Sequence, residues 1–211
     1  MIKSLLNVIA ESVVPRAPVA VSMPIFPLSS VLFPGGTLAL RVFERRYMEM
    51  ATACLKTGAT FGIALIRSGT EVGTPAEPES IGTVARITDW DMQDLGILQI
   101  RVQGTERFRL VGQSIAESGL IIGEAIPIAS DLHEDCPAFA PCTQFLRKVQ
   151  LRTALSTVDT DRFDDAEWVS FRITELLPLG NAVKQKMLAL TSARIRLEIL
   201  QRILAEQRLI A

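Results

Sequence analysis

The sequence predicts an α+β fold in which a curled, β-rich barrel with one inserted helix is followed by a C-terminal helical bundle. Two observations predict this fold. Short apolar segments of strand length, separated by Pro- and Gly-containing turns, fill the first two-thirds of the 211-residue chain, and only one helical pattern interrupts them. From about residue 142 onward, apolar residues recur every three or four positions, as they do on one face of a helix.

The composition is that of an ordinary globular protein with no electrostatic preference for a partner. Hydrophobic residues make up 48% of the chain and charged residues 21%, which argues against disorder. The 22 basic and 23 acidic residues give a net charge of -1, so nucleic acid is an unfavoured partner. The three cysteines are an odd, sparse set without an export signal, so we expect reduced thiols and a cytoplasmic location.

The longest uncharged run, residues 17–40, has the length of a membrane span but not its chemistry. It contains four prolines and two adjacent glycines, which would break the hydrogen bonds of a helix in lipid. We therefore expect extended, buried chain here and no membrane partner. Residues 1–20 precede the first strand pattern as an N-terminal extension.

Proline and glycine residues mark the ends of the first predicted strands and of the inserted helix. Residues 19–23 and 31–42 are apolar, β-branched and broken by Pro and Gly, which favours strands joined by tight turns. Residues 44–56 carry apolar side chains at helical spacing, and Gly58 follows as a C-terminal stop. Residues 60–66 form a continuous apolar run of strand length.

The remaining strands are predicted by alternation. Residues 68–80 are rich in Gly, Pro, Thr and Glu and indicate an exposed loop. Residues 82–90 and 95–103 flank a polar tetrapeptide and form a predicted hairpin. Residues 107–113 and 119–128 supply two more strands. The β-rich domain therefore spans residues 21–128.

A change of composition marks the second domain. Residues 129–141 are acidic and small, contain two prolines and indicate a linker. Residues 142–211 form the predicted helical bundle. Within it, Asp164 and Glu167 have the spacing of a capping box. The last helix, residues 192–207, is expected to turn an apolar stripe inward, made of Ile195, Ile199 and Ile203.

Four motifs occur along the chain in a fixed order. They are MPIFPLSSVLFPGGTLALRVFERRY at residues 23–47, GTERFRL at 104–110, LLPL followed by KQKML between 176 and 188, and RLEIL at 196–200. Together they resemble the substrate-binding N-terminal domain of Lon proteases over roughly residues 22–206. Arg45 departs from the pattern, because the family often has Pro at that position.

The resemblance implies a PUA-like pseudobarrel followed by a helical bundle, and a module that binds polypeptide without transforming it. A Lon ATPase needs a phosphate-binding loop, but Leu55 stands where that loop requires Gly before Lys56 and Thr57. The family's Ser–Lys protease dyad belongs to a domain with no counterpart in this sequence. We therefore expect a stand-alone Lon-domain protein without ATPase or peptidase domains, with no catalytic residue, no enzyme activity and no cofactor.

Candidate substrate-binding residues come from the helix start, the hairpin and the apolar opening. They are Phe33, Arg45, Arg46 and Trp90. Arg45 and Arg46 are expected to be exposed, and Trp90 lies beside an acidic hairpin. Phe33 is included, although the phenylalanines of this stretch equally suit a core.

A second set is expected to serve the fold. This structural polar cluster comprises Arg41, Glu44, Tyr47 and Arg107. Arg41 and Glu44 are predicted to form an internal ion pair, with Glu44 also favoured by the positive end of the helix dipole. Tyr47 would then be a core aromatic.

A metal site is considered and not expected. His133, Cys136 and Cys142 place three ligand types in one loop, but no second cysteine pair supports zinc binding. The simpler interpretation is a solvated loop with two incidental thiols.

The functional hypothesis is recognition of unfolded or flexible protein segments, or of a partner protein, as an adaptor. Two alternatives come from other PUA-like domains: RNA binding, which the near-neutral charge disfavours, and small-molecule binding, for which two Trp and one Tyr provide few cage residues. The identity of the partner, the recruitment of a separate ATPase or protease, and the oligomeric state are left open by the sequence.

Overall fold

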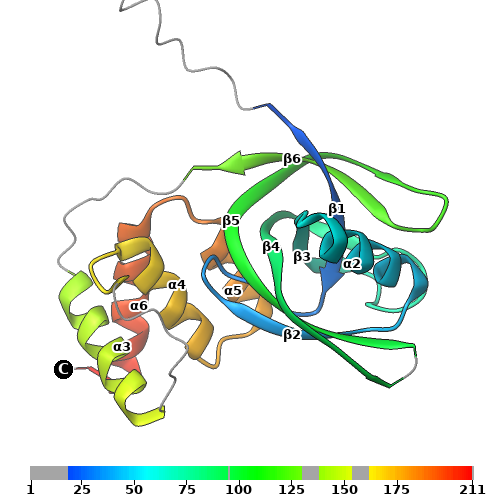
Figure 1. Cartoon of the computed structure of the whole chain (residues 1–211). Coiled ribbons are helices and arrows are strands. Elements are labelled where there is room, and N and C mark those ends of the chain that lie inside the picture. The colour runs from blue at the N-terminus through cyan, green and yellow to red at the C-terminus, as the bar shows by residue number, and fades with distance from the viewer. Residues whose placement is uncertain (1–18, 95, 130–137, 154–161, 211) are drawn as a thin grey trace, which may run out of the picture.

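The computed structural model describes residues 19–94, 96–129, 138–153 and 162–210. Strands lie between residues 21 and 128, and four of the five described helices follow them, gathered at one end of the barrel (Figure 1). The fifth, α2, is inserted between strands and packs on the barrel itself. The predicted α+β class, with one inserted helix and C-terminal helices, is confirmed.

Six strands form one sheet that closes on itself. They are β1 (Val21–Leu28), β2 (Thr37–Val42), β3 (Phe61–Ser68), β4 (Glu77–Asp94), β5 (Ile97–Ile115) and β6 (Ile121–Ile128). Their order is β2-β5-β4-β3-β1-β6, and a further β5–β6 pairing closes the barrel. The long β5 pairs with β2 through its first half and with β6 through its second half. The barrel thus leaves β2 outside its closed ring.

The strand boundaries differ from the predicted ones in several places. β1 continues to Leu28 and β2 begins only at Thr37, where strands over residues 19–23 and 31–42 were predicted. β4 begins at Glu77, inside the predicted loop 68–80, because it pairs with the end of β3. The predicted strands 95–103 and 107–113 are one continuous β5. Gly104 joins them, and a Cβ there would lie 2.3 Å from the carbonyl oxygen of Phe33, so only glycine lets the two chains approach.

A glycine bulge sets the register of β2. Gly35 has a φ of 74°, and its N–H donates to the Gly104 oxygen at 2.8 Å, while the Gly104 N–H donates to the Gly36 oxygen at 2.9 Å. This is the pattern of a G1 bulge, which requires glycine in the left-handed conformation at its first position. The regular β2–β5 ladder starts directly after it.

The helices are α2 (Arg45–Thr57), α3 (Phe139–Thr153), α4 (Ala166–Leu176), α5 (Asn181–Ala189) and α6 (Ala193–Glu206). α2 ends at Gly58 as predicted, with a φ of 73°. The N-cap of α4 is Asp165 rather than Asp164, since the Asp165 side chain accepts the Trp168 N–H at 3.0 Å. One apolar core lies in the barrel, where α2 packs against it. A separate apolar core lies among α3, α4 and α6.

The predicted apolar stripe of α6 is correct in part. Ile199 and Ile203 are half-buried and pack against the helical core, but Ile195 is exposed, and Arg196, Leu197, Leu200 and Leu204 are the buried residues. The buried face is centred on leucines and includes a buried arginine, because α6 packs against both α3 and α4 and contributes to the ion network described next.

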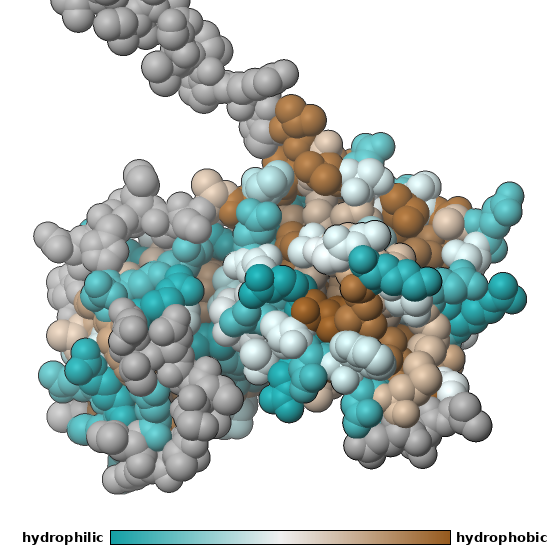
Figure 2. All heavy atoms as spheres, in the orientation of Figure 1, coloured by the Kyte–Doolittle hydropathy of each residue, from teal (hydrophilic) through white to brown (hydrophobic). Residues whose placement is uncertain are grey.

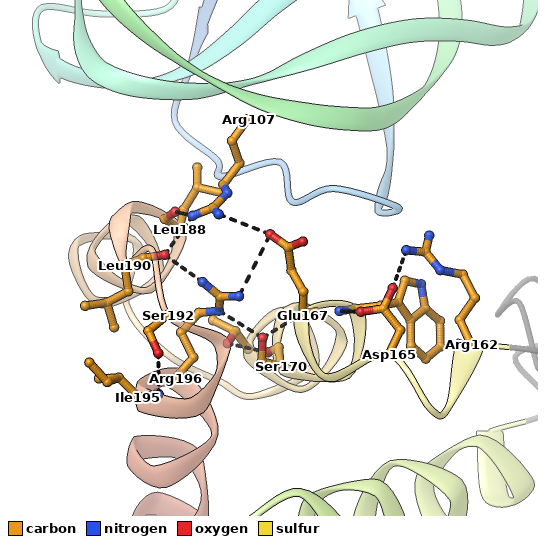
Figure 3. Close-up of polar contacts among 12 residues, drawn as sticks. Arg107, Arg162, Asp165, Glu167, Ser170, Leu188, Leu190, Ser192, Ile195 and Arg196 are labelled. Carbon is orange, nitrogen blue, oxygen red and sulfur yellow. Dashed lines mark hydrogen bonds and ion pairs between the residues drawn. The ribbon is translucent and has the colours of Figure 1, made fainter. Parts of the chain in front are cut away.

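A buried ion network joins the barrel to the helices (Figure 3). Arg107 on β5 lies 3.1 Å from the Glu167 carboxylate of α4, and it donates to the carbonyl oxygens of Leu188 and Leu190 at 3.1 and 2.7 Å. Arg196 of α6 donates to the Leu190 oxygen at 2.6 Å and lies 4.0 Å from Glu167. One carboxylate therefore serves two arginines from opposite sides of the interface.

An aromatic ring completes this network. The guanidinium groups of Arg107 and Arg196 lie 5.4 and 4.2 Å from the centroid of Phe171, and Arg196 also donates to the Ser170 hydroxyl at 2.9 Å. Phe33 packs on Phe171 from the barrel side, with centroids 5.6 Å apart. Buried arginines are tolerated when charge, hydrogen bonds and a ring face replace their hydration, and this interface supplies all three.

We predict that Arg107→Ala lowers the free energy of unfolding by about 3 kcal/mol, because it takes the nearer of two cations from the Glu167 carboxylate and leaves the Leu188 carbonyl without its donor. Urea denaturation followed by circular dichroism measures the change. Arg109→Ala is the matched control at an exposed position of the same strand and should stay within about 0.5 kcal/mol of the wild type. Equal stabilities for the two variants would contradict the role assigned to the network.

Candidate functional site

A cavity of about 360 Å³ lies between β2, the end of β1, the start of α2 and the loop after β3. We call it the β2 groove. Its apolar lining is Phe26, Leu28, Leu38, Leu40, Phe43 and Val72. Figure 2 shows hydrophobic side chains reaching the surface between β2 and α2, bordered by hydrophilic ones.

The strand beside this groove has an unpaired edge. Among the described strands, β5 is the one that pairs with β2. From the glycine bulge onward, antiparallel alternation turns the backbone N–H and C=O groups of Leu38 and Leu40 toward β5, and those of Thr37, Ala39 and Arg41 toward the free edge. The side chains alternate as well: Leu38 and Leu40 are half-buried, and the other three are exposed.

The floor of the groove is rigid. Tyr47 stacks on Phe26 with ring centroids 4.0 Å apart, and the Arg46 guanidinium lies 4.7 Å above the Tyr47 ring. Arg46 also contacts the Glu44 carboxylate at 2.9 Å and donates to the Gly119 oxygen at 3.2 Å. Burial raises the pKa of Tyr47 above its ordinary value, so its phenol stays neutral and can act as a hydrogen-bond donor or acceptor at pH 7.

The predicted roles of Arg41 and Arg46 are exchanged in the structure. Arg46 was expected to be exposed and to contact substrate, but it is 6% exposed and it is the arginine that pairs with Glu44. Arg41 was expected in that ion pair, but it is exposed on the free edge of β2 and lines the groove. The side chains of a strand alternate between faces, and position 41 falls on the outer one.

Two other predicted residues lie away from the groove. Phe33 is 0% exposed, so the prediction of a surface contact there is wrong: the ring is enclosed between the barrel and α4. Arg107 is structural, as expected, but it belongs to the interface with the helices and not to a cluster with Arg41, Glu44 and Tyr47. Pattern alone does not reveal which of several arginines is drawn inside.

The remaining candidates are exposed near the groove. Arg45 pairs with Glu49 at 2.8 Å on the outer face of α2, and its side chain is 92% exposed. Trp90 is 57% exposed. It borders a second hollow of about 360 Å³ that shares Ala39 and Arg41 with the groove, so β2 is flanked by both. Whether either candidate contacts substrate stays a prediction.

Glu71 and Val72 of the groove wall were not predicted. They belong to the segment expected to be an exposed loop, and no periodicity there indicates that it lies over a cavity. The unpaired edge of β2 could likewise not be predicted from the sequence, since strand order is decided by pairing between segments that are distant along the chain.

The described residues hold no group of three His, Cys, Asp or Glu arranged for a metal. Cys142 is buried in α3 with its Sγ 3.8 Å from the Leu197 oxygen. His133 and Cys136, with which it was considered as a ligand set, lie outside the described residues, as does most of the predicted linker 129–141 and of the extension 1–20.

No helix in the described part of the chain combines the length and apolar character that crossing a bilayer requires.

Comparison with known proteins places this fold. The sequence model of the ATP-dependent protease La (LON) substrate-binding domain matches residues 22–206. The chain belongs to this family. The Lon resemblance inferred from the four motifs is thereby confirmed, and the match assigns residues 22–206 to the substrate-binding part of Lon.

Solved structures agree with the Lon assignment. The Lon N-terminal domain protein from Xanthomonas campestris is 36% identical, with 85% of this chain and 96% of that chain covered and a TM-score of 0.71. The N-terminal domain of the Mycobacterium avium complex Lon protease shares the fold at 19% identity and a TM-score of 0.67, with 85% and 96% covered. The comparison with curated proteins gave no match.

We predict that Arg46→Ala costs about 2 kcal/mol of unfolding free energy, because it removes the cation over Tyr47 and the partner of Glu44. The neighbouring Arg45→Ala is the control and should leave the free energy of unfolding close to that of the wild type, since its ion pair is exposed. Thermal and urea unfolding of both variants measure the two changes in unfolding free energy. A larger loss for Arg45→Ala than for Arg46→Ala would reverse the assignment.

Proposed function

We propose that this Lon-type domain holds extended, unfolded or flexible segments of other proteins in the β2 groove and does not transform them. The observation that carries the proposal is the unpaired edge of β2 alongside an apolar cavity of about 360 Å³. An extended segment can add to such an edge through main-chain hydrogen bonds, which are independent of its sequence. This suits a module whose substrates share a lack of structure.

The chemistry of the walls supports this mode of binding. A segment paired with β2 turns every second side chain toward Leu38, Leu40 and the Phe26–Tyr47 floor. Apolar side chains exposed by unfolding would be removed from water there, at about 25 cal/mol per Å² of apolar surface. The intervening side chains would face solvent beside Arg41.

The charges of the groove favour polypeptide over nucleic acid. Its charged groups are Arg41, Glu44 and Glu71, and the Glu44 carboxylate is already paired with Arg46. A surface that follows a phosphate backbone needs several cations along its length. An adaptor role, in which bound segments are delivered to a separate ATPase or protease, is compatible with a domain that binds without catalysis.

We predict that Ala39→Pro weakens binding of a reduced, alkylated and therefore unfolded polypeptide about tenfold. Proline removes the Ala39 N–H, which points away from β5, so an incoming strand loses a donor while the sheet keeps its own bonds. Isothermal titration calorimetry measures the affinity, and circular dichroism verifies that the variant is folded.

Ala39→Val is the matched control, because it keeps the N–H and should bind like the wild type. Equal affinities for the proline and valine variants would place the site elsewhere on the domain. Absence of any binding by the wild-type protein to several unfolded polypeptides would refute the proposed function. A rise in melting temperature with metabolites, or a salt-sensitive complex with RNA, would then favour the corresponding alternative.

A further inference from the structure

We infer that the loop of residues 69–76, which we call the strap, is a gate over the β2 groove, and that the Glu71 carboxylate latches it closed on the backbone of Ser29. The inference rests on the proposed function of the groove for its biological meaning. Its structural content, a loop with a fixed base and a single latch, rests on the contacts described below.

The base of the strap is fixed at both ends. The Glu77 carboxylate pairs with Arg67 and accepts a hydrogen bond from the Ser68 hydroxyl at 3.0 Å. These partners also hold the pKa of Glu77 below its ordinary value, so the carboxylate remains charged at neutral pH. Gly69 and Ala76 lie so close that a Cβ on Gly69 would be 3.1 Å from the Ala76 Cα. The strap therefore leaves and re-enters the sheet at one point.

The tip of the strap is held far more lightly. Within residues 70–75 the Thr70 hydroxyl donates to the Val72 oxygen at 2.8 Å, a bond internal to the strap. In the described part of the chain, the hydrogen bond from the Ser29 N–H to the Glu71 carboxylate is the one that ties these residues to the barrel. A charged acceptor makes this a strong latch, yet it is a single one.

The position of the tip makes the latch relevant to the groove. Glu71 and Val72 both line the cavity, and Val72 is 53% exposed although it is apolar. When Glu71 is bound to Ser29, Val72 forms part of the wall opposite β2. Release of the latch would move this wall away from the strand edge and widen the entrance for an extended segment.

The backbone of the strap is built to pivot. Gly69 has a φ of 99° and Gly73 a φ of 95°, so both lie in the left-handed region that favours glycine. No atom lies within 4 Å of the place where a Cβ on Gly73 would be. A side chain added at Gly73 would therefore meet open space, and the left-handed backbone conformation is the one feature there that favours glycine.

The latch is also connected to the helices. The Ser29 carbonyl accepts a hydrogen bond from the Asn181 side chain at the start of α5, while the Ser29 N–H serves Glu71. The residue that anchors the strap is thus itself anchored by the helical bundle. A shift of α5 against the barrel would displace the anchor and loosen the strap.

The direct test is hydrogen exchange of the Ser29 amide in the ligand-free protein. We expect Glu71→Ala to raise the Ser29 exchange rate at least tenfold while leaving the melting temperature of the protein nearly unchanged. Thr74→Ala, an exposed substitution in the same strap, is the matched control and should leave the rate as in the wild type. Unchanged exchange in Glu71→Ala would overturn the latch.

A second variant tests the gate through the backbone instead of the carboxylate. Gly73→Ala disfavours the left-handed conformation of the closed strap without a clash, so it should also raise Ser29 exchange. Both variants should accelerate association of an unfolded polypeptide severalfold in stopped-flow fluorescence. Faster exchange with an unchanged association rate would show that the strap opens but does not gate the groove.

The two proposals fail in different ways. If the wild-type protein binds no unfolded polypeptide, the proposed function is lost, while faster Ser29 exchange in Glu71→Ala still establishes the latch. A second outcome is that the polypeptide binds the wild type and binds Ala39→Pro more weakly, while neither strap variant alters Ser29 exchange. In that case the proposed binding in the β2 groove is supported and the gate is refuted.

Discussion

The arrangement of this domain depends on a single partly buried carboxylate, Glu167, shared by the buried Arg107 of the barrel and the buried Arg196 of the last helix over the face of Phe171. Each arginine has lost its hydration, so each needs the carboxylate, the ring and the nearby carbonyls at the same time. These demands are met in one relative placement of barrel and helices. Electrostatics thereby specifies the interface that apolar contacts alone would leave adjustable.

This placement also shapes the β2 groove, although its lining among the described residues comes from the barrel, α2 and the loop after β3. Arg172 of α4 donates to the Pro34 oxygen at 2.9 Å, directly before the glycine bulge that sets the register of β2. Asn181 of α5 holds Ser29, the anchor of the opposite wall. Both sides of the groove are therefore connected by hydrogen bonds to the helical bundle, which gives the bundle a structural role in the shape of the groove.

Much of the fold was predictable from local pattern, and much of the site was not. The inserted helix with its stop at Gly58 and the change from strands to helices follow from periodicity and turn residues, which act over a few positions. The exchange of Arg41 and Arg46 shows the limit. Both are arginines near one corner, and only the packing of Tyr47 on Phe26 decides which guanidinium covers the ring.

Local patterns along the chain sufficed to predict the class of the fold and most of the order of its elements, and four ordered motifs indicated the Lon family. Those properties are encoded in residues that are neighbours along the chain. The tertiary structure alone decided that β2 keeps an open edge, that residues 69–76 lie over a cavity and that Phe33 and Arg107 are enclosed. These features arise from contacts between segments far apart in sequence, where pairing and burial, and not local propensity, carry the free energy.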